Sequence, residues 1–388
     1  ARLSALCWVA LAALQAFSSP TQQAEFVPYT AVPTSTIPET FLSFNFDFNK
    51  NISVSDAWSN ASVTWTLDLQ DRRLIALASA LAPANLRVGG SYADEAVYGG
   101  FPGGVECPAE IEQQHYCLTP SRWDELVAFC ERTGLRLVFD LNVMYGRQNG
   151  EWDPTNTYSL LSYTRSKYPS FPHGFELGNE KERQLSPADT ARCYMRVRDM
   201  IDQLWAHAGP GERPMLVGPA YNLRPDWLVQ FLKHLKPHVL DAVTYHLYMG
   251  FGGSAAMEWL VTDVAWLDSQ MAVMQEQANA LRATPAGRAT ELWIGETAAC
   301  WNSGRAGVTD SFVSGFWWLH TLATAARSGH SAVCRQALVG GNYSLLDQRD
   351  GFRPNPDYWT ALLWRRLVGT RILAGSQYQI SHTTSSPS

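Results

Sequence analysis

Two glutamates stand at or near the ends of short apolar runs in this sequence. Glu180 closes the run at 174–180, and Glu296 is the penultimate residue of the run at 291–297. Splitting an acetal needs such a pair, because an acid must protonate the leaving oxygen while a carboxylate lies beneath the anomeric carbon. Asn179 directly precedes Glu180, and its amide can bind a sugar 2-hydroxyl, a contact that strengthens in the transition state. The pair predicts a glycosidase site, although either glutamate alone would more often be a surface acid.

Eight β-rich runs alternate with segments of helical character. The runs span 41–48, 85–90, 135–142, 174–180, 215–220, 242–248, 291–297 and 332–341. Between them lie helical segments such as 121–132 and 186–208, with capping patterns that begin at Ser121 and Ser186. This alternation predicts a (β/α)8 barrel first and a doubly wound sheet second. In a barrel the C-terminal strand ends share one face, which would place both glutamates in the same mouth.

Two further features concern the interior of the protein. Glu176 has the strand parity of Glu180, so we expect it to point inward and deeper, as a structural carboxylate. The apolar run at 312–319 soon meets His320 and Arg327, so it predicts a buried helix and not a membrane span.

Composition limits the partners. The 388 residues are 46% apolar and 17% charged, enough for a large core, and the formal net charge is −6. This charge argues against nucleic acid and against a strongly anionic polymer as an obligatory partner. The 15 Trp and 15 Tyr suit a carbohydrate cleft, although the core takes most such rings. No CxxC spacing is present, and we expect a monomer without metal or organic cofactor.

The N-terminus and the cysteines indicate an oxidising compartment. Residues 1–19 combine a basic start, a short apolar stretch and small residues, which is typical of a secretory signal peptide. Cys107 and Cys117 lie in a loop-like stretch and are predicted to form a disulfide. We therefore expect secretion, or a lysosome- or vacuole-like compartment, and leave association with a membrane or cell wall open. Sequons at Asn51 and Asn60 would then accept glycans.

The chain ends differ in character from the barrel, which we place at 41–375. Residues 20–40 carry strand-forming residues and prolines, and predict an accessory β strand without a partner sheet. Residues 376–388 are rich in Ser and Thr and are expected to be a disordered tail.

Longer motifs resemble those of glycoside hydrolase family 79, the heparanases and β-glucuronidases. Asn-Glu ending the fourth run, with Glu ending the seventh, is similar to the wider clan of retaining barrel glycosidases. The family-like motifs lie at 86–90, 175–180, 243–248 and 334–343. Those that resemble plant heparanase-like proteins lie at 117–126, 301–305 and 355–364. The resemblance covers residues 41 to 373.

The resemblance implies a role for each site residue. Glu180 would be the general acid/base and Glu296 the nucleophile, with His246 and Tyr248 beside the nucleophile and Tyr248 donating to its carboxylate. The other residues implied to contact sugar are Asn179, Gln336, Gly341 and Tyr343, the last three around a uronate carboxylate, with Asp47 and Asn49 at the non-reducing-end subsite. Without the resemblance, His246 would more often be a core histidine and the turn at 340–343 a simple tight turn.

The implied activity is hydrolysis of a β-linked glucuronic acid residue with retention. The substrate would be a terminal glucuronide, a uronic-acid-bearing cell-wall or proteoglycan glycan, or an internal heparan-like linkage, and the negative charge favours the first two. One alternative is a catalytically silent carbohydrate-binding barrel, and another is a barrel enzyme with aldol or isomerase chemistry. The family's β-sandwich has no counterpart after 363–373, so we expect a remnant of a truncated accessory domain. An exposed apolar patch would then include some of Trp359, Leu362 and Leu363.

Overall fold

The computed structural model describes residues 22–28, 33–47, 67–107, 116–170, 173–209, 211–254, 256–373 and 376–382. The chain divides into two compact units. Residues 37–370 form the larger unit, and residues 1–36 with 371–388 form the smaller one. The predicted signal peptide at 1–19 and the sequons at Asn51 and Asn60 lie outside the described residues.

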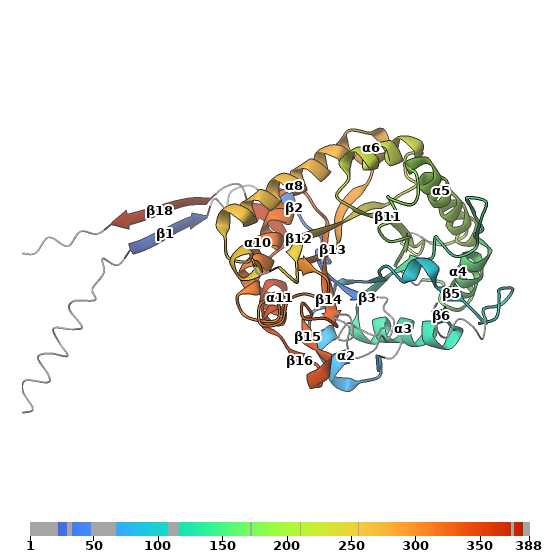
Figure 1. Ribbon diagram of the computed structural model, residues 1–388, viewed down its shortest axis with the longest axis horizontal. Helices are drawn as coiled ribbons and strands as arrows, with labels where there is room; N and C mark the ends of the chain where they lie inside the picture. Colours follow the sequence, from blue (N-terminus) through green and yellow to red (C-terminus); the bar gives the residue numbers. More distant parts are fainter. Residues whose placement is uncertain are drawn as a thin grey trace, which may run out of the picture. The chain divides into compact units, whose positions relative to one another are not determined.

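The larger unit contains a closed barrel of parallel strands (Figure 1). In pairing order the strands are β3 (Leu42–Asp47), β4 (Asn85–Gly89), β7 (Arg136–Leu141), β10 (Gly174–Leu177), β11 (Met215–Asn222), β12 (Ala242–Phe251), β13 (Glu291–Trp301) and β14 (Ala332–Val339). Strand β14 pairs with both β13 and β3, which closes the barrel. Each of the predicted runs supplies one strand, so the predicted barrel is confirmed.

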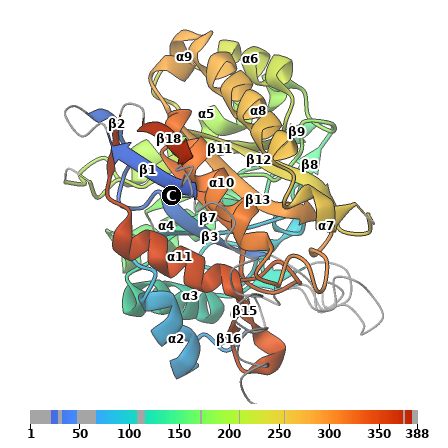
Figure 2. The same cartoon turned by 90° about the vertical axis from the view of Figure 1, so that its left-hand side faces the viewer.

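A helix follows each barrel strand and covers the outside of the barrel (Figures 1 and 2). These helices are α2 (Arg72–Ser79), α3 (Pro120–Thr133), α4 (Thr155–Lys167), α5 (Pro187–Leu204), α6 (Pro225–His234), α8 (Val264–Arg282), α10 (Ser314–Arg327) and α11 (Pro356–Leu367). Ser186 caps α5 as predicted, accepting the N–H of Asp189. Helix α3 begins earlier than predicted, because Thr119 is its N-cap and Pro120 suits the first helical position.

The barrel interior changes from apolar to polar along the strands. The N-terminal parts of five strands contribute a buried apolar cluster of Val138, Val217, Ala242, Trp293 and Ala332. Toward the C-terminal ends, Glu176 is fully buried and accepts a hydrogen bond from the Thr244 hydroxyl at 2.5 Å. Arg87 is buried beside it and donates to the same carboxylate. A buried charge is stable only when it is paired, so this polar layer ties neighbouring strands together beneath the barrel mouth. The prediction that Glu176 points inward is confirmed.

The run at 312–319 leads into α10, which is buried on one side only. Trp317 and Trp318 are buried, whereas Phe312, Phe316 and Leu319 are exposed. The prediction of a buried helix holds for the inner face of α10, which includes Trp317, Trp318 and Leu322, whereas its outer face is exposed. Among the described residues, no helix has the length and apolar character needed to cross a membrane.

Helix α11 lies beside α10 and also exposes apolar side chains (Figure 2). Trp359 is 53% exposed and Leu363 is 56% exposed, in line with the expected patch, while Leu362 is partly buried. The truncated accessory domain stays a prediction, since exposure alone does not identify what would cover these residues.

The smaller unit contains two antiparallel pairs that join the two ends of the chain. Strand β1 (Gln22–Pro28) pairs with β18 (Ser376–His382), and β2 (Pro33–Thr36) pairs with β17 (Arg371–Leu373). The expectations of an unpartnered N-terminal strand and of a disordered tail are therefore wrong for these residues. The Ser/Thr content of the whole tail hid the alternation of Tyr378 and Ile380 with polar residues, which suits a strand.

Candidate active site

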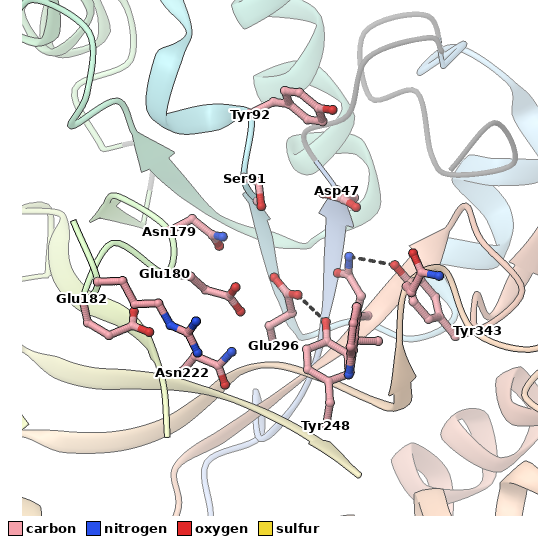
Figure 3. Close-up of a pocket in the computed structure, with 15 residues that line it drawn as sticks. Asp47, Ser91, Tyr92, Asn179, Glu180, Glu182, Asn222, Tyr248, Glu296 and Tyr343 are labelled. Atoms are coloured by element: carbon pink, nitrogen blue, oxygen red, sulfur yellow. Dashed lines mark hydrogen bonds between the residues drawn. The ribbon is translucent and has the colours of Figure 1, made fainter. Parts of the chain in front are cut away.

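A cavity of about 670 Å³ opens at the C-terminal ends of the barrel strands. It brings together seven of the predicted site residues: Asp47, Asn179, Glu180, Tyr248, Glu296, Gln336 and Tyr343. Figure 3 shows Glu180 and Glu296 facing one another across it. His246 is fully buried and contacts Glu180, and Asn49 lies outside the described residues. The strand order therefore places residues far apart in sequence around one pocket.

Glu296 lies within strand β13, and both of its carboxylate oxygens accept hydrogen bonds. Oε2 accepts from Nη1 of Arg87 at 3.0 Å, and Oε1 accepts from the hydroxyl of Tyr248 (Figure 3). Tyr248 comes from the neighbouring strand β12, and the register pairs His246 of that strand with Glu296. These contacts fix the carboxylate in one orientation at the mouth of the barrel.

Arg87 connects the two sides of the site, a role that sequence reasoning missed. Besides Glu296 it donates to Glu176 and, through Nη2 at 2.9 Å, to Oδ1 of Asn179. Burial acts against its charge, but the surrounding carboxylates of Glu176, Glu296 and Asp140 raise its pKa well above the ordinary value. Arg87 therefore remains a cation. Its position within a fully buried five-residue strand was the available signal, because a buried arginine requires acidic partners.

Glu180 lies beyond the end of strand β10, on a turn. The strand ends at Leu177, Gly178 has φ +77°, and Glu180 itself has φ +53°, in the left-handed region. Its backbone N–H donates to the carbonyl of Ala220 at 2.9 Å. The side chain remains one-third exposed in the cavity, where a ligand can reach it.

Glu180 and His246 form a hydrogen-bonded pair, with 2.7 Å between Oε1 and Nδ1. Burial raises the pKa of Glu180, but the hydrogen bond and charge of His246, with Arg87 and Lys181, lower it overall. Burial lowers the pKa of His246, but the charge of Glu296 and the bond to Glu180 raise it overall. In the free protein these opposite shifts favour a carboxylate on Glu180 and an imidazolium on His246.

The two carboxylates and the imidazole are close together. One oxygen each of Glu180 and Glu296 and one nitrogen of His246 all lie within 4.8 Å of one another. Such a trio has the donor atoms of a metal site. However, the guanidinium of Arg87 lies 3.0 Å from Glu296 and already places a positive charge on that carboxylate, which disfavours a divalent cation there.

Asp47, Gln336 and Tyr343 form the wall of the cavity near strands β3 and β14. Nε2 of Gln336 donates to the Tyr343 hydroxyl at 3.3 Å. Burial and the charge of Glu296 raise the pKa of Asp47 to about 8, although Arg87 and a hydrogen bond with Gln336 oppose the rise. Asp47 is therefore mostly protonated at neutral pH and can donate a hydrogen bond.

Gly341 is placed beneath this wall and is absent from the cavity lining. Its φ is +74°, and a Cβ there would meet the Tyr343 ring at 2.8 Å and Oγ of Ser303 at 2.9 Å. Gly341 therefore permits close packing of two loops. The loop it packs on, Asn302 to Gly304, has three successive positive φ values of 64°, 64° and 79°.

Sequence reasoning also missed residues at the rim. Trp301 lines the cavity, is 51% exposed and packs against Phe251 with 4.6 Å between ring centroids. Phe251 and Trp301 end the neighbouring strands β12 and β13 and are paired in register. Both strands extend beyond their predicted ends, so these rings lie further along the strands than Tyr248 and Glu296. The sequence could not predict that Trp301 borders the cavity, because this depends on how far strand β13 extends.

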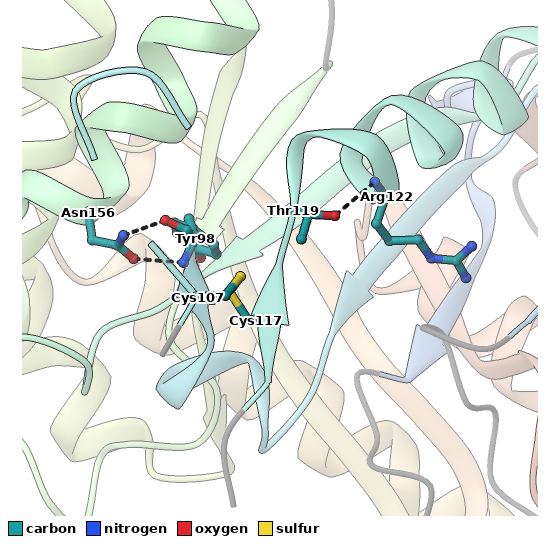
Figure 4. Close-up of a disulfide and its surroundings, with 6 residues drawn as sticks. All are labelled: Tyr98, Cys107, Cys117, Thr119, Arg122 and Asn156. Atoms are coloured by element: carbon teal, nitrogen blue, oxygen red, sulfur yellow. Dashed lines mark hydrogen bonds between the residues drawn. A yellow bond between two sulfur atoms is a disulfide. The ribbon is translucent and has the colours of Figure 1, made fainter. Parts of the chain in front are cut away.

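The predicted disulfide joins Cys107 and Cys117 (Figure 4). It links the loop after β5 (Val97–Tyr98) to β6 (Cys117–Leu118), which leads into helix α3. Gly99 lies against the bond, and a Cβ there would meet both sulfur atoms at 2.5 Å. The disulfide thus braces the loop that leads from strand β4 to α3.

Comparison with known proteins links this chain to carbohydrate-active barrels. A family model described as "Glycosyl hydrolase family 79, N-terminal domain" matches residues 41–323. Heparanase-like protein 1 of Arabidopsis thaliana is 32% identical over 342 residues, which cover 82% of this chain and 61% of the relative. Baicalin-beta-D-glucuronidase of Scutellaria baicalensis is 30% identical over 349 residues, covering 81% and 65%. The chain thus spans a little under two thirds of the length of these relatives.

Two further matches bear on the activity and on the fold. Inactive heparanase-2 of Mus musculus is 27% identical over 417 residues, covering 89% of this chain and 66% of the relative. Among solved structures, the GH51 arabinofuranosidase from Xanthomonas axonopodis pv. citri superposes with a TM-score of 0.66 at 13% identity, covering 93% of this chain and 79% of that one. At this identity the structural match supports the barrel fold alone.

Proposed function

The chain belongs to glycosyl hydrolase family 79, and from this premise we propose that it is a retaining glycoside hydrolase that releases a β-linked glucuronic acid residue. Glu296 is the nucleophile and Glu180 the general acid/base. The observation that carries the proposal is the approach of their carboxylate oxygens to within 4.8 Å in one cavity. Retaining enzymes have carboxyl groups about 5–5.5 Å apart, whereas inverting enzymes leave roughly 6.5–9.5 Å for a water molecule.

The first step forms a covalent glycosyl-enzyme. Glu296 attacks the anomeric carbon while Glu180 gives a proton to the glycosidic oxygen, which departs as an alcohol or phenol. Below the pKa of His246 the Glu180–His246 pair holds one shared proton. The 2.7 Å hydrogen bond lets this proton pass from Nδ1 of His246 to the Glu180 carboxylate, which gives it to the leaving oxygen. Arg87 and Tyr248 hold Glu296 in the orientation for attack.

The second step returns both carboxyl groups to their starting states. Glu180, now a carboxylate, takes a proton from water while the water oxygen attacks the anomeric carbon and displaces Glu296. Two inversions at that carbon give net retention of the β configuration. The proton gained by Glu180 restores the single proton of the pair, so protons balance over a full cycle.

The wall of Asp47, Gln336 and Tyr343 supports a uronic acid in the sugar-binding position. A protonated Asp47, with a pKa of about 8, does not repel a sugar carboxylate, and the Tyr343 hydroxyl and the Gln336 amide can donate to one. The remaining lining favours small or weakly charged leaving groups. Its charged members are the carboxylates of Glu180, Glu182 and Glu296 and the guanidinium of Arg183. A sulfated polyanion would meet this excess of acids.

A second candidate is a barrel that binds carbohydrate without catalysis. The similarity to a protein named inactive heparanase-2 keeps this alternative open. Against it stands the complete arrangement of both glutamates with Arg87 and Tyr248, which simple binding would not require.

One assay compares these candidates. Chromogenic β-glucuronide, β-glucoside and β-galactoside would be incubated with the protein, with heparan sulfate alongside and Glu296→Gln as the inactive control. We expect hydrolysis of the glucuronide above all the others and loss of it in the variant. Binding of glucuronides without turnover would support the silent barrel, and preference for glucoside or galactoside would overturn the glucuronic acid assignment.

A further inference from the structure

A buried carboxylate outside the pair of glutamates contacts the residues on both sides of Glu180. Asp94 lies in the short 3-10 helix Ala93–Glu95 that follows strand β4, and its side chain is fully buried. Its Oδ1 accepts the backbone N–H of Asn179 at 3.0 Å, and its Oδ2 lies 2.9 Å from Nζ of Lys181. One side chain therefore holds residues 179 and 181, and with them the backbone that carries Glu180.

The turn at Glu180 needs such support. Its left-handed φ of +53° is unfavourable for a residue with a side chain, and the Ala220 carbonyl that accepts the Glu180 N–H belongs to another residue with positive φ, +52°. Gly178 packs close to Asp94, because a Cβ there would lie 3.2 Å from Oδ1. Asp94 serves two donors with its two oxygens, the Asn179 N–H and the Lys181 ammonium. An asparagine has only one acceptor oxygen, so one of these donors would face an amide NH2 in a buried place, and the turn would relax.

Asp94 is itself anchored to a different part of the barrel. Its carbonyl accepts the N–H groups of Met144 and Tyr145, in the loop after strand β7. Burial raises the pKa of Asp94 to about 7, while Lys181 and the Asn179 N–H act to lower it and so stabilise the charged form. The link thus runs from the loop after the third strand, through Asp94, to the turn after the fourth.

We propose that Asp94, paired with Lys181, is a positioning residue that aims the carboxyl group of Glu180 at the leaving-group oxygen. This inference rests on the proposed function, since it assumes that Glu180 is the acid/base. Asp94 is fully buried and does not line the cavity, so its effect passes through the backbone of residues 179–181. The nucleophile Glu296 is held by Tyr248 and by Arg87. Arg87 also bonds the Asn179 side chain in the turn, but its bond to the buried carboxylate of Glu176 remains when the turn loosens, so Glu296 keeps both of its donors.

This separation gives a readout that a merely structural residue would not change. An alkyl glycoside, whose leaving group is strongly basic, depends on protonation by Glu180 for cleavage. A dinitrophenyl glycoside leaves as a stable anion and needs little protonation. The parameter kcat/KM reports the first step alone, so a misplaced acid lowers it for the alkyl substrate far more than for the dinitrophenyl one.

The test compares Asp94→Asn, Lys181→Met and Lys181→Arg with the unmodified chain on these two glycosides of the same sugar. We expect Asp94→Asn to lower kcat/KM about 10-fold to 100-fold for the alkyl glycoside, part of the 10²–10⁴-fold value of general acid catalysis, and at most about twofold for the dinitrophenyl glycoside. Lys181→Met should show a smaller effect in the same direction, and Lys181→Arg should restore most of it. Azide should raise kcat of Asp94→Asn on the dinitrophenyl glycoside, because azide needs no base.

A matched control is Asp357→Asn, which breaks another buried ion pair, 2.8 Å from Arg335. It should lower thermal stability without changing the ratio between the two substrates. If Asp94→Asn lowers both substrates equally, or neither, the positioning role is wrong. If Asp94→Asn does not fold, Lys181→Met and Lys181→Arg decide in the same way. An unmodified chain inactive on both glycosides would instead overturn the proposed function, so the two failures are distinguishable.

Discussion

The two glutamates of the site are held in different ways. Glu296 lies inside a regular strand, and each of its oxygens accepts a bond from a fixed donor, Arg87 or Tyr248. Glu180 lies past the end of its strand, on a left-handed turn, and its carboxylate is bonded to His246, a group that itself gains and loses protons. A nucleophile must stay ionised and aimed, whereas an acid/base must exchange a proton in every cycle. The surroundings of each residue match these separate requirements.

The largest expected effect comes from Glu296, the glutamate inside the strand. Glu296→Gln keeps the shape of the side chain and its contacts but removes the attacking oxygen's charge. We expect kcat on an aryl β-glucuronide to fall by about 10⁴-fold or more, the scale seen when a nucleophile is removed. Glu291→Gln, at the exposed start of the same strand, serves as the control and should retain activity. Substantial activity in Glu296→Gln would place the nucleophile elsewhere.

The next effect concerns the proton shared by Glu180 and His246. In His246→Asn the catalytic proton can reside only on Glu180, so it is lost as the pH rises past the pKa of a carboxyl group. In the unmodified chain the Glu180–His246 pair keeps the proton until the pH rises through the raised pKa of His246. The high-pH limb of kcat/KM should move down by about two pH units, the difference between ordinary glutamate and histidine values. At neutral pH the loss would be about 100-fold. A limb that stays in place would show that His246 does not hold this proton.

A smaller effect is expected from the hydroxyl that orients the nucleophile. Tyr248→Phe removes one donor to Glu296 but leaves Arg87 on the other oxygen. One charge-assisted hydrogen bond corresponds to about 1.5–3 kcal/mol, so kcat/KM should fall roughly 10-fold or somewhat more. The loss should be similar for alkyl and dinitrophenyl glycosides, because nucleophilic attack is common to both. A loss confined to the alkyl substrate would show that Tyr248 serves the acid instead.

The smallest effect on catalysis is expected from loss of the disulfide between Cys107 and Cys117. Cys107→Ser with Cys117→Ser opens a loop with a sequence separation of 10, which should lower the free energy of unfolding by about 2–3 kcal/mol. Thermal unfolding under oxidising conditions measures this loss. The kinetic constants below the unfolding temperature should change less than twofold. A selective loss of activity without loss of stability would mean that this loop takes part in the site.

Some parts of the molecule could be predicted from the sequence, and others depend on contacts between distant segments. Barrel strands and the glutamate pair could be predicted, because periodicity and strand ends are local patterns that the closed barrel converts into proximity. The role of Arg87 could not, since one guanidinium joins groups from two other strands, β10 with its following turn and β13. The turn at Glu180 was taken for strand because its left-handed φ depends on contacts with Asp94 and Ala220. The paired ends were missed because strand β1 finds its partner at the far end of the chain.

The different roles proposed for the two glutamates are measured most directly by the stereochemistry of azide products. In Glu180→Gln an activated aryl glucuronide can still form the glycosyl-enzyme, and azide, which needs no base, should restore turnover and give the β-glycosyl azide. In Glu296→Ala azide takes the place of the missing carboxylate, enters from the opposite face and should give the α-glycosyl azide. Nuclear magnetic resonance of the isolated products assigns each anomer. An α-azide from Glu180→Gln with a β-azide from Glu296→Ala would contradict the account and reverse the two roles.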